Sequence, residues 1–194
     1  MSQRRRALCA VLVALMSLQG CLSANTATND EAIASDEDPF PNHNPDEYEC
    51  FTHNDWELCY ITHVPDSVNE EANAPLIVEL HGWAGSAFET RALTDITLLA
   101  DDVGAIVVHP EGIIVDNTTL TTGGNEEAWN AGYCCGDALY YEIDDVDYLR
   151  TVIARTIETF PVDEQRIYIT GWSNGCMMAP VSYTHLTLPT ISRV

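Results

Sequence analysis

Short apolar runs alternate with longer amphipathic segments along the middle of the chain. The runs at 58–64, 76–81 and 105–109 predict strands, because they are short and rich in β-branched or aromatic residues. The segments at 87–102 and 144–160 are longer and predict helices. Strands that alternate with helices in this way are typical of βαβ units, so the pattern predicts an α/β fold.

The second predicted helix has one apolar face. Its large apolar residues recur at helical spacing: Val146, Leu149, Ile153, Ile157 and Phe160. Asp144 and Asp145 stand at its start, where acidic side chains cap backbone N–H groups and interact favourably with the helix dipole. We therefore interpret these two aspartates as structural, rather than as catalytic or metal-binding residues.

A strand-like run at 166–170 leads into the pentapeptide G-W-S-N-G at 171–175. The pattern G-x-S-x-G between a strand and a helix is typical of a nucleophile elbow, a tight turn that presents a reactive serine. Glycines flank the serine because side chains there would collide with the neighbouring strand and helix. The context predicts Ser173 as a catalytic nucleophile, and the alternative is an ordinary Gly/Ser turn.

A second motif lies upstream, where an apolar run ends in the glycine-rich loop H-G-W-A-G at 81–85. In an α/β-hydrolase such a loop supplies one backbone N–H of the oxyanion hole, and the residue after the nucleophile supplies the other. Those donors would be the backbone N–H groups of Trp83 and Asn174. Taken alone, the His-Gly pair fits a plain strand-to-helix turn equally well.

Four segments of the chain resemble, in the same order, segments of secreted esterases grouped as polyhydroxybutyrate depolymerases and feruloyl or acetylxylan esterases. The segments are L-H-G-W at 80–83, W-N-A-G-Y-C-C-G at 129–136, D-D-V-D-Y-L at 144–149 and G-W-S-N-G-C-M-M-A at 171–179. The resemblance implies the N-terminal half of an α/β-hydrolase fold, up to the elbow. It also implies hydrolysis of carboxylic esters through an acyl-enzyme, with no metal and no organic cofactor. Cys176 departs from the family pattern, which usually has a third glycine there.

Four aromatic residues belong to these motifs or flank them: Trp83, Trp129, Tyr133 and Trp172. We expect them to line a pocket for an aryl or polyester substrate, and the alternative is that they pack in the core. The net charge of −22 and the lack of lysine argue against nucleic acids and anionic polymers as partners, because like charges repel. Two other functions remain open: a serine peptidase of the same fold, and a lipid-anchored binding module without catalysis.

The first residues predict export. Three arginines at 4–6 precede an apolar stretch at 7–18 that is too short to span a bilayer comfortably. The sequence L-Q-G-C at 18–21 resembles a bacterial lipoprotein processing box, so residues 1–21 are expected to be a signal peptide and Cys21 the lipidated first residue of the mature chain. An ordinary secretory signal is the alternative. Residues 22–47 are polar and acidic, which predicts a flexible tether. The predicted location is extracellular or in the cell envelope, with membrane contact only through the lipid anchor.

Export places the cysteines in an oxidising compartment, where disulfides form. The spacing of Cys50 and Cys59 suits a disulfide that clamps the tether onto the first strand. Cys134 and Cys135 are adjacent, and we expect them to bridge to other partners rather than to each other. Cys176 would find its partner downstream. No His or Cys pair has convincing zinc spacing, and His43, His53 and His63 are expected to be solvated or core residues.

The end of the chain departs from the pattern. Pro180 comes soon after the elbow and is expected to break the helix there. Residues 181–190 resemble a translated sequencing-library adaptor, so the esterase domain is predicted over 48–179 and a non-native tail over 180–194. In α/β-hydrolases the catalytic acid and histidine follow the serine. We expect both to be absent from this chain, do not assign His185 as the base, and expect the chain alone to be inactive.

Overall fold

The computed structural model describes residue 44 and residues 47–69, 71–113 and 127–185, with side chains up to residue 182. These residues all lie within the unit Pro39–Val194. The predicted signal peptide, Cys21, His43, nearly all of the predicted tether and the end of the suspected tail lie outside the described residues. Across the described ranges, none of the helices is both long and apolar enough to cross a membrane.

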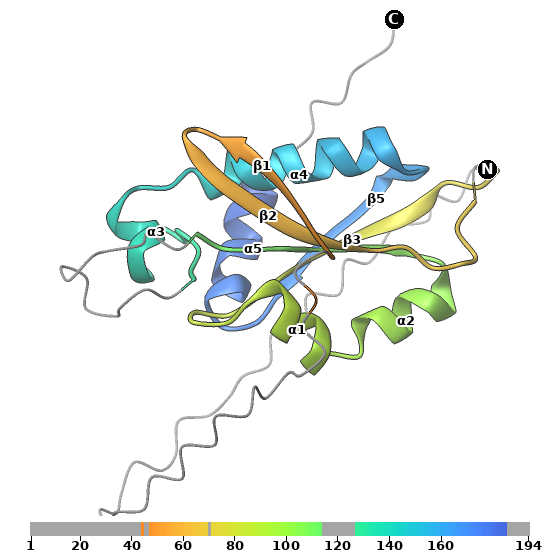
Figure 1. Ribbon diagram of the computed structural model, residues 1–194, viewed down its shortest axis with the longest axis horizontal. Helices are drawn as coiled ribbons and strands as arrows, with labels where there is room; N and C mark the ends of the chain where they lie inside the picture. Colours follow the sequence, from red (N-terminus) through yellow and green to blue (C-terminus); the bar gives the residue numbers. More distant parts are fainter. Residues whose placement is uncertain (1–43, 45–46, 70, 114–126, 186–194) are drawn as a thin grey trace, which may run out of the picture. The chain divides into compact units, whose positions relative to one another are not determined.

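The described residues form a five-stranded mixed sheet in the order β1-β2-β4-β3-β5 (Figure 1). The strands are β1 (Tyr48–His53), β2 (Trp56–His63), β3 (Ala74–Leu80), β4 (Ile106–Pro110) and β5 (Val162–Gly171). β2 pairs antiparallel with β1 and β4, whereas β3 pairs parallel with β4 and β5. Because parallel strands end at the same edge of a sheet, the segments that follow β3, β4 and β5 meet there.

Helices cover both faces of the sheet. They are α1 (Ala87–Leu93), α2 (Ile96–Val103), α3 (Gly136–Tyr140), α4 (Asp145–Thr159) and α5 (Asn174–His185). α1 and α2 lie on one side of the sheet, and α4 lies on the other side, next to α5 (Figure 1). Successive residues of β3 pack on opposite faces of the sheet. Leu76 and Val78 belong to the core cluster that includes residues of α4 and α5, whereas Ile77 packs against the cluster that includes residues of α2. This is the partial α/β-hydrolase architecture that the sequence predicts.

Most predicted elements are confirmed to within a few residues, but the single helix predicted over 87–102 is wrong. Two helices occupy that segment, because Thr94 is extended, with φ −104° and ψ 150°. Its hydroxyl donates to Glu79 Oε2 at 3.1 Å, which holds the chain out of the helix. A strand that the sequence pattern does not predict precedes β2. There Asn54 and Asp55, both at positive φ, form the turn of a β1–β2 hairpin.

Pro180 does not end the elbow helix, contrary to the sequence-based expectation. α5 continues through it to His185. Proline removes one backbone N–H and so leaves the carbonyl of Cys176 without its usual helical donor. Cys176 is exposed, so water can solvate that carbonyl. Beyond the proline, Val181 packs against the main core and Ser182 is fully buried, which favours continuation of the helix.

The predicted structural role of the first α4 residues is confirmed for Asp144. Its Oδ1 accepts the backbone N–H of Asp147 at 3.0 Å and so caps the helix. The predicted apolar face is also confirmed, because Leu149 and Ile153 are buried in the main core. Asp145 is buried as well, and it holds the segment that follows residue 126, as described below.

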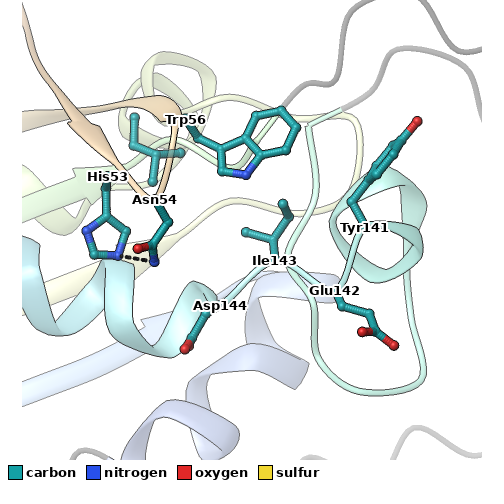
Figure 2. Close-up of a pocket in the computed structure, with 8 residues that line it drawn as sticks. His53, Asn54, Trp56, Tyr141, Glu142, Ile143 and Asp144 are labelled. Carbon is teal, nitrogen blue, oxygen red and sulfur yellow. Dashed lines mark hydrogen bonds between the residues drawn. The ribbon is translucent and has the colours of Figure 1, made fainter.

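A cavity of about 180 Å³ opens between the β1–β2 turn and the connection from α3 to α4 (Figure 2). Its wall includes the rings of Trp56 and Tyr141, whose centroids lie 6.3 Å apart. His53 also lines it and lies 3.2 Å from the carboxylate of Asp147. None of the predicted site residues lines this cavity, so the candidate active site is a different part of the molecule.

Candidate active site

Ser173 occupies the turn between β5 and α5, as the sequence context predicts. Its φ is +49°, a left-handed conformation that is strained for a residue with a side chain. The turn is held by three backbone hydrogen bonds: Trp172 N–H to Leu80 O at 3.0 Å, Gly175 N–H to Trp172 O at 2.9 Å and Met177 N–H to Ser173 O at 3.1 Å. Ser173 is exposed at this turn, so its hydroxyl is accessible to a substrate.

The two glycine-containing motifs pack directly on each other. A Cβ atom on Gly175 would lie 2.4 Å from the carbonyl oxygens of both Leu80 and His81, so only glycine fits there. A Cβ on Gly82 would lie 3.1 Å from Trp172 Cδ1. The loop after β3 therefore lies against the elbow after β5, which is the juxtaposition that an oxyanion hole requires.

The peptide unit between Gly82 and Trp83 is held by its carbonyl. Gly82 O accepts from His81 Nδ1 at 2.7 Å and from the N–H of Gly85 at 3.1 Å. In a planar trans peptide the N–H points away from the carbonyl, so these bonds also fix the direction of the Trp83 N–H. Asn174 is the first residue of α5, and its backbone N–H has no acceptor within the helix. Gly82 packs against Ser173 and Asn174 follows it in the chain, and the donor role of the Trp83 and Asn174 N–H groups stays a prediction.

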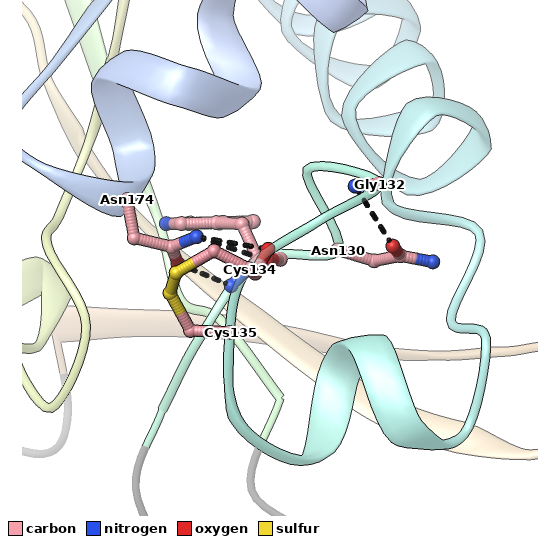
Figure 3. Close-up of a disulfide and its surroundings, with 6 residues drawn as sticks. Asn130, Gly132, Cys134, Cys135 and Asn174 are labelled. Carbon is pink, nitrogen blue, oxygen red and sulfur yellow. Dashed lines mark hydrogen bonds between the residues drawn. A yellow bond between two sulfur atoms is a disulfide. The ribbon is translucent and has the colours of Figure 1, made fainter.

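The Asn174 side chain is buried under the elbow (Figure 3). Its Nδ2 donates to the carbonyl of Trp129 at 3.1 Å and lies 3.4 Å from that of Cys134. Cys134 and Cys135 are bonded to each other, so the expectation that each bridges to a different partner is wrong. The predicted disulfide between Cys50 and Cys59 is confirmed, and Cys176 is exposed and free.

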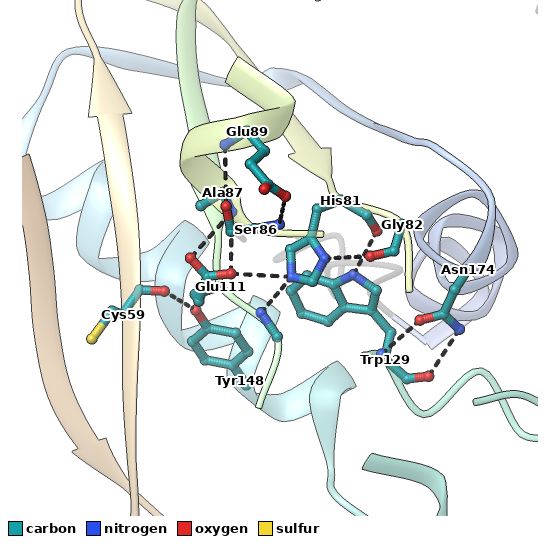
Figure 4. Close-up of polar contacts among 11 residues, drawn as sticks. Cys59, His81, Gly82, Ser86, Ala87, Glu89, Glu111, Trp129, Tyr148 and Asn174 are labelled. Carbon is teal, nitrogen blue, oxygen red and sulfur yellow. Dashed lines mark hydrogen bonds and ion pairs between the residues drawn. The ribbon is translucent and has the colours of Figure 1, made fainter. Parts of the chain in front are cut away.

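His81 is a structural residue in this site rather than a base. The ring is fully buried, and burial lowers the pKa of His81 to about 4, so it is neutral at physiological pH. Nδ1 carries the proton that it donates to Gly82 O, and Nε2 accepts the N–H of Gly112 at 2.7 Å (Figure 4). Both ring nitrogens are therefore occupied, and the tautomer is fixed.

Glu111 follows β4 and contacts both ends of the loop that joins β3 to α1. Its carboxyl oxygens accept the N–H of Ala87, the first residue of α1, at 3.1 Å. Burial raises the pKa of Glu111 to about 8, and the carboxyl lies 3.4 Å from His81 Nε2. Because both pKa shifts favour uncharged forms, this is a contact between neutral groups. Glu111 is not among the predicted site residues, although an acidic residue directly after a buried strand is an available signal.

The four aromatic candidates separate into two groups. Trp83, Tyr133 and Trp172 have 45%, 74% and 75% of their surface exposed, and they are available to a substrate. Trp129 is fully buried, with its ring 4.9 Å from that of His81 and stacked on Tyr148 at 6.3 Å. Trp129 therefore follows the core alternative and does not reach a substrate surface.

No catalytic triad is assembled among the residues that the structure describes. Each of the four histidines whose side chains the structure describes is engaged with another partner: His53 with Asp147, His63 with Asp101, His81 with Gly82 and Gly112, and His109 with Glu79. Nor do the described ranges contain a cluster of three or more His, Cys, Asp or Glu residues suited to a metal ion. The described site thus consists of the turn at Ser173 and the Gly82 loop that packs against it.

The parallel strand and helix core, with a G-x-S-x-G turn at the carboxyl end of β5, has the α/β-hydrolase fold. Comparison with known structures agrees. The acetyl xylan esterase from Aspergillus awamori superposes with a TM-score of 0.50 at 18% identity, covering 70% of this chain and 46% of that structure. The S-formylglutathione hydrolase from Agrobacterium tumefaciens gives 0.53 at 15% identity, covering 72% and 52%. At these identities the likeness concerns the fold alone.

Sequence comparison is more specific. No family model matches the chain. Feruloyl esterase B of Piromyces equi is 32% identical over 115 residues, which make up 59% of this chain and 19% of that protein. The chain is therefore similar in sequence to this feruloyl esterase, as the four motifs predict, and it spans about a fifth of the length of that protein.

Proposed function

We propose that the intact protein is an exported serine esterase that hydrolyses carboxylic esters through an acyl-enzyme. The observation that carries this proposal is the left-handed backbone of exposed Ser173, at +49°, with the Gly82 loop packed against it. Such strain persists only where the surrounding structure enforces it, and it is concentrated at functional sites.

In this mechanism Ser173 Oγ attacks the ester carbonyl carbon. The backbone N–H groups of Trp83 and Asn174 stabilise the oxyanion of the tetrahedral intermediate, and loss of one such donor typically costs about 3 kcal/mol. The alcohol then leaves, and water hydrolyses the acyl-enzyme. A histidine must accept the serine proton, and an acid must orient that histidine. We propose that residues beyond the elbow, outside this chain, supply both, and that the chain alone is inactive.

The exposed aromatic rings favour an aryl acyl group. Trp83, Tyr133 and Trp172 belong to the elbow and to the two segments that contact it, and aromatic rings stack favourably on one another. Feruloyl esters of plant polysaccharide fit this surface, and acetyl esters or polyhydroxyalkanoates are the other members of the proposed class. The charge of −22 favours uncharged substrates over anionic polymers.

Two alternative functions, a serine peptidase and a binding module, predict results that differ from those of an esterase. A serine peptidase of the same fold would cleave the amide analogue of the ester at a comparable rate, because the elbow alone does not distinguish the two. A lipid-anchored binding module would bind an aryl ester without cleaving it. The histidines engaged away from Ser173 within the described ranges are the observation that favours this module.

Export through a lipid anchor at Cys21 is part of the proposal, and the disulfide between Cys50 and Cys59 supports an oxidising compartment. Expressed in a bacterium that processes lipoproteins, the protein should fractionate with membranes. Cys21→Ser should release or misprocess it. A soluble mature protein that begins at another residue would instead indicate an ordinary signal peptide.

The activity is tested by hydrolysis of a feruloyl ester and of an acetyl ester by the intact protein. Ser173→Ala should abolish both reactions. Ser67→Ala, which alters another exposed serine, should leave them unchanged and serves as the matched control. Undiminished turnover by the Ser173→Ala variant would exclude the proposed nucleophile.

A further inference from the structure

Asn174 and Trp129 pair through two buried hydrogen bonds. The backbone N–H of Trp129 donates to Asn174 Oδ1 at 2.7 Å, and Asn174 Nδ2 donates to the Trp129 carbonyl at 3.1 Å. The Asn174 side chain thus pairs with a backbone as a neighbouring strand would. The two residues are 1% and 0% exposed, so water does not compete for these groups.

The indole of Trp129 holds a second part of the site. Its Nε1–H donates to the carbonyl of His81 at 2.9 Å (Figure 4). His81 in turn anchors the Gly82 carbonyl, which belongs to the same peptide unit as the Trp83 N–H. Trp129 therefore contacts His81, which positions the proposed Trp83 donor. It also contacts the side chain of Asn174, whose backbone N–H is the other proposed donor.

Trp129 is itself held from α4. The next residue, Asn130, donates its backbone N–H to the buried carboxylate of Asp145 at 2.6 Å, and its side chain donates to the Ile143 carbonyl at 3.0 Å. The ring stacks on Tyr148. Because these anchors lie in or next to α4, they do not depend on the elbow or on the loop after β3.

We propose that Trp129 is a positioning residue that sets the separation of the two oxyanion donors, by bonding to His81 on one side and Asn174 on the other. This inference rests on the proposed function, because the donors matter only if an oxyanion forms. Donor placement within about 0.5 Å is what transition-state stabilisation requires. A substrate in its ground state depends less on that placement, so the effect falls on kcat rather than on KM.

The test uses the intact protein and two conservative variants. Trp129→Phe removes the indole N–H and keeps an aromatic ring, and Asn174→Asp keeps Oδ1 as an acceptor while replacing the donor to the Trp129 carbonyl. Both leave the Trp83 and Asn174 backbone N–H groups in the chain. Trp56→Phe is the matched control, because Trp56 lines a different cavity beside Tyr141, which neither His81 nor Asn174 lines.

Each variant is assayed for kcat and KM with an aryl ester, and for its affinity for an aryl boronic acid, which forms a tetrahedral serine adduct. Trp129→Phe and Asn174→Asp should lower kcat about tenfold or more. The loss should not exceed that caused by removal of one oxyanion donor. Boronic acid affinity should fall in parallel, whereas KM should change by less than about threefold. Thermal unfolding shows whether each variant is folded, and two variants keep the test valid if one is not.

The outcomes separate the two proposals. An active parent with Trp129→Phe and Asn174→Asp variants that fold and keep kcat within about twofold would overturn the positioning role alone. Equal losses of kcat in Trp56→Phe would overturn it too, since the effect would then be general destabilisation. A folded parent that neither hydrolyses esters nor binds the boronic acid at Ser173 would overturn the proposed function and, with it, the oxyanion role of this contact.

Discussion

Gly82 lies against Ser173: a Cβ atom on Gly82 would be 3.4 Å from the Ser173 Cβ. The loop that follows β3 and the turn that follows β5 are distant in sequence, and this contact brings them together. Parallel pairing of β3 and β5, with Leu80 opposite Gly171, is what places their carboxyl ends side by side. The geometry at this contact leads to the first prediction.

Gly82→Ala should impair catalysis more than folding. The added methyl group would meet Trp172 Cδ1 at 3.1 Å, which forces either the loop or the exposed indole to move by a few tenths of an ångström. Movement of the loop displaces the Trp83 donor, so we expect kcat to fall about tenfold or more. Steady-state kinetics with an aryl ester, together with thermal unfolding, measures both effects. An unaltered kcat would show that the indole alone moves.

Gly175→Ala should destabilise the fold itself. Its Cβ would lie 2.4 Å from two backbone oxygens at the end of β3, and neither can move without disrupting the strand. We expect a loss of roughly 3 kcal/mol or failure to fold, as for severe overpacking. Cys176→Ala is the matched control, because Cys176 is the next residue and is exposed. Denaturant unfolding that gave the same midpoint for both variants would contradict the close packing.

The free energy of unfolding should decrease as the pH rises from mildly acidic to alkaline, because Glu111 titrates over this range. Its pKa is raised from 4.5 to about 8 in the fold, so the protonated form is favoured there. The stabilisation that protonated Glu111 contributes to the fold is therefore complete below about pH 4.5, and it is lost as the pH rises through about 8. The expected loss between pH 5 and pH 8 is about 3 kcal/mol. Glu111→Gln should remove this part of the pH dependence in unfolding titrations, and an unchanged slope would refute the assignment.

The disulfide between Cys50 and Cys59 should stabilise the β1–β2 hairpin. It closes a short loop, with a sequence separation of 9, and joins residues that are directly opposite in the two strands. Loop-closure entropy predicts a contribution of about 2–3 kcal/mol. The double variant Cys50→Ser with Cys59→Ser should lose that amount in denaturant unfolding, whereas Cys176→Ser should lose almost nothing.

The sequence predicts those parts of the fold that depend on local periodicity. β4 is confirmed because its residues form a continuous buried apolar run, and α4 is confirmed because one face recurs at helical spacing in the core. The break at Thr94 was missed because it depends on a hydrogen bond to Glu79 on a different element. The continuation of α5 past Pro180 was missed because burial of the following turn is a tertiary effect.

The same division applies to the site. The elbow at Ser173 and the loop at Gly82 are local motifs, so the sequence indicates them. The contact between Trp129 and Asn174 joins residues 45 positions apart, and no period or spacing encodes it. The sequence does not predict that Trp172 is exposed and Trp129 buried, because both residues are tryptophans in glycine-containing segments.

The central claim is that Ser173 is an activated nucleophile, and covalent labelling tests it most directly. The intact protein is treated with a fluorophosphonate, digested and analysed by mass spectrometry, beside the Ser173→Ala and Ser67→Ala variants. We predict one adduct on the peptide that contains Ser173, absent from Ser173→Ala and retained in Ser67→Ala. An intact, folded protein without this adduct, or with the adduct on another serine, would contradict the assignment of this chain as a serine esterase.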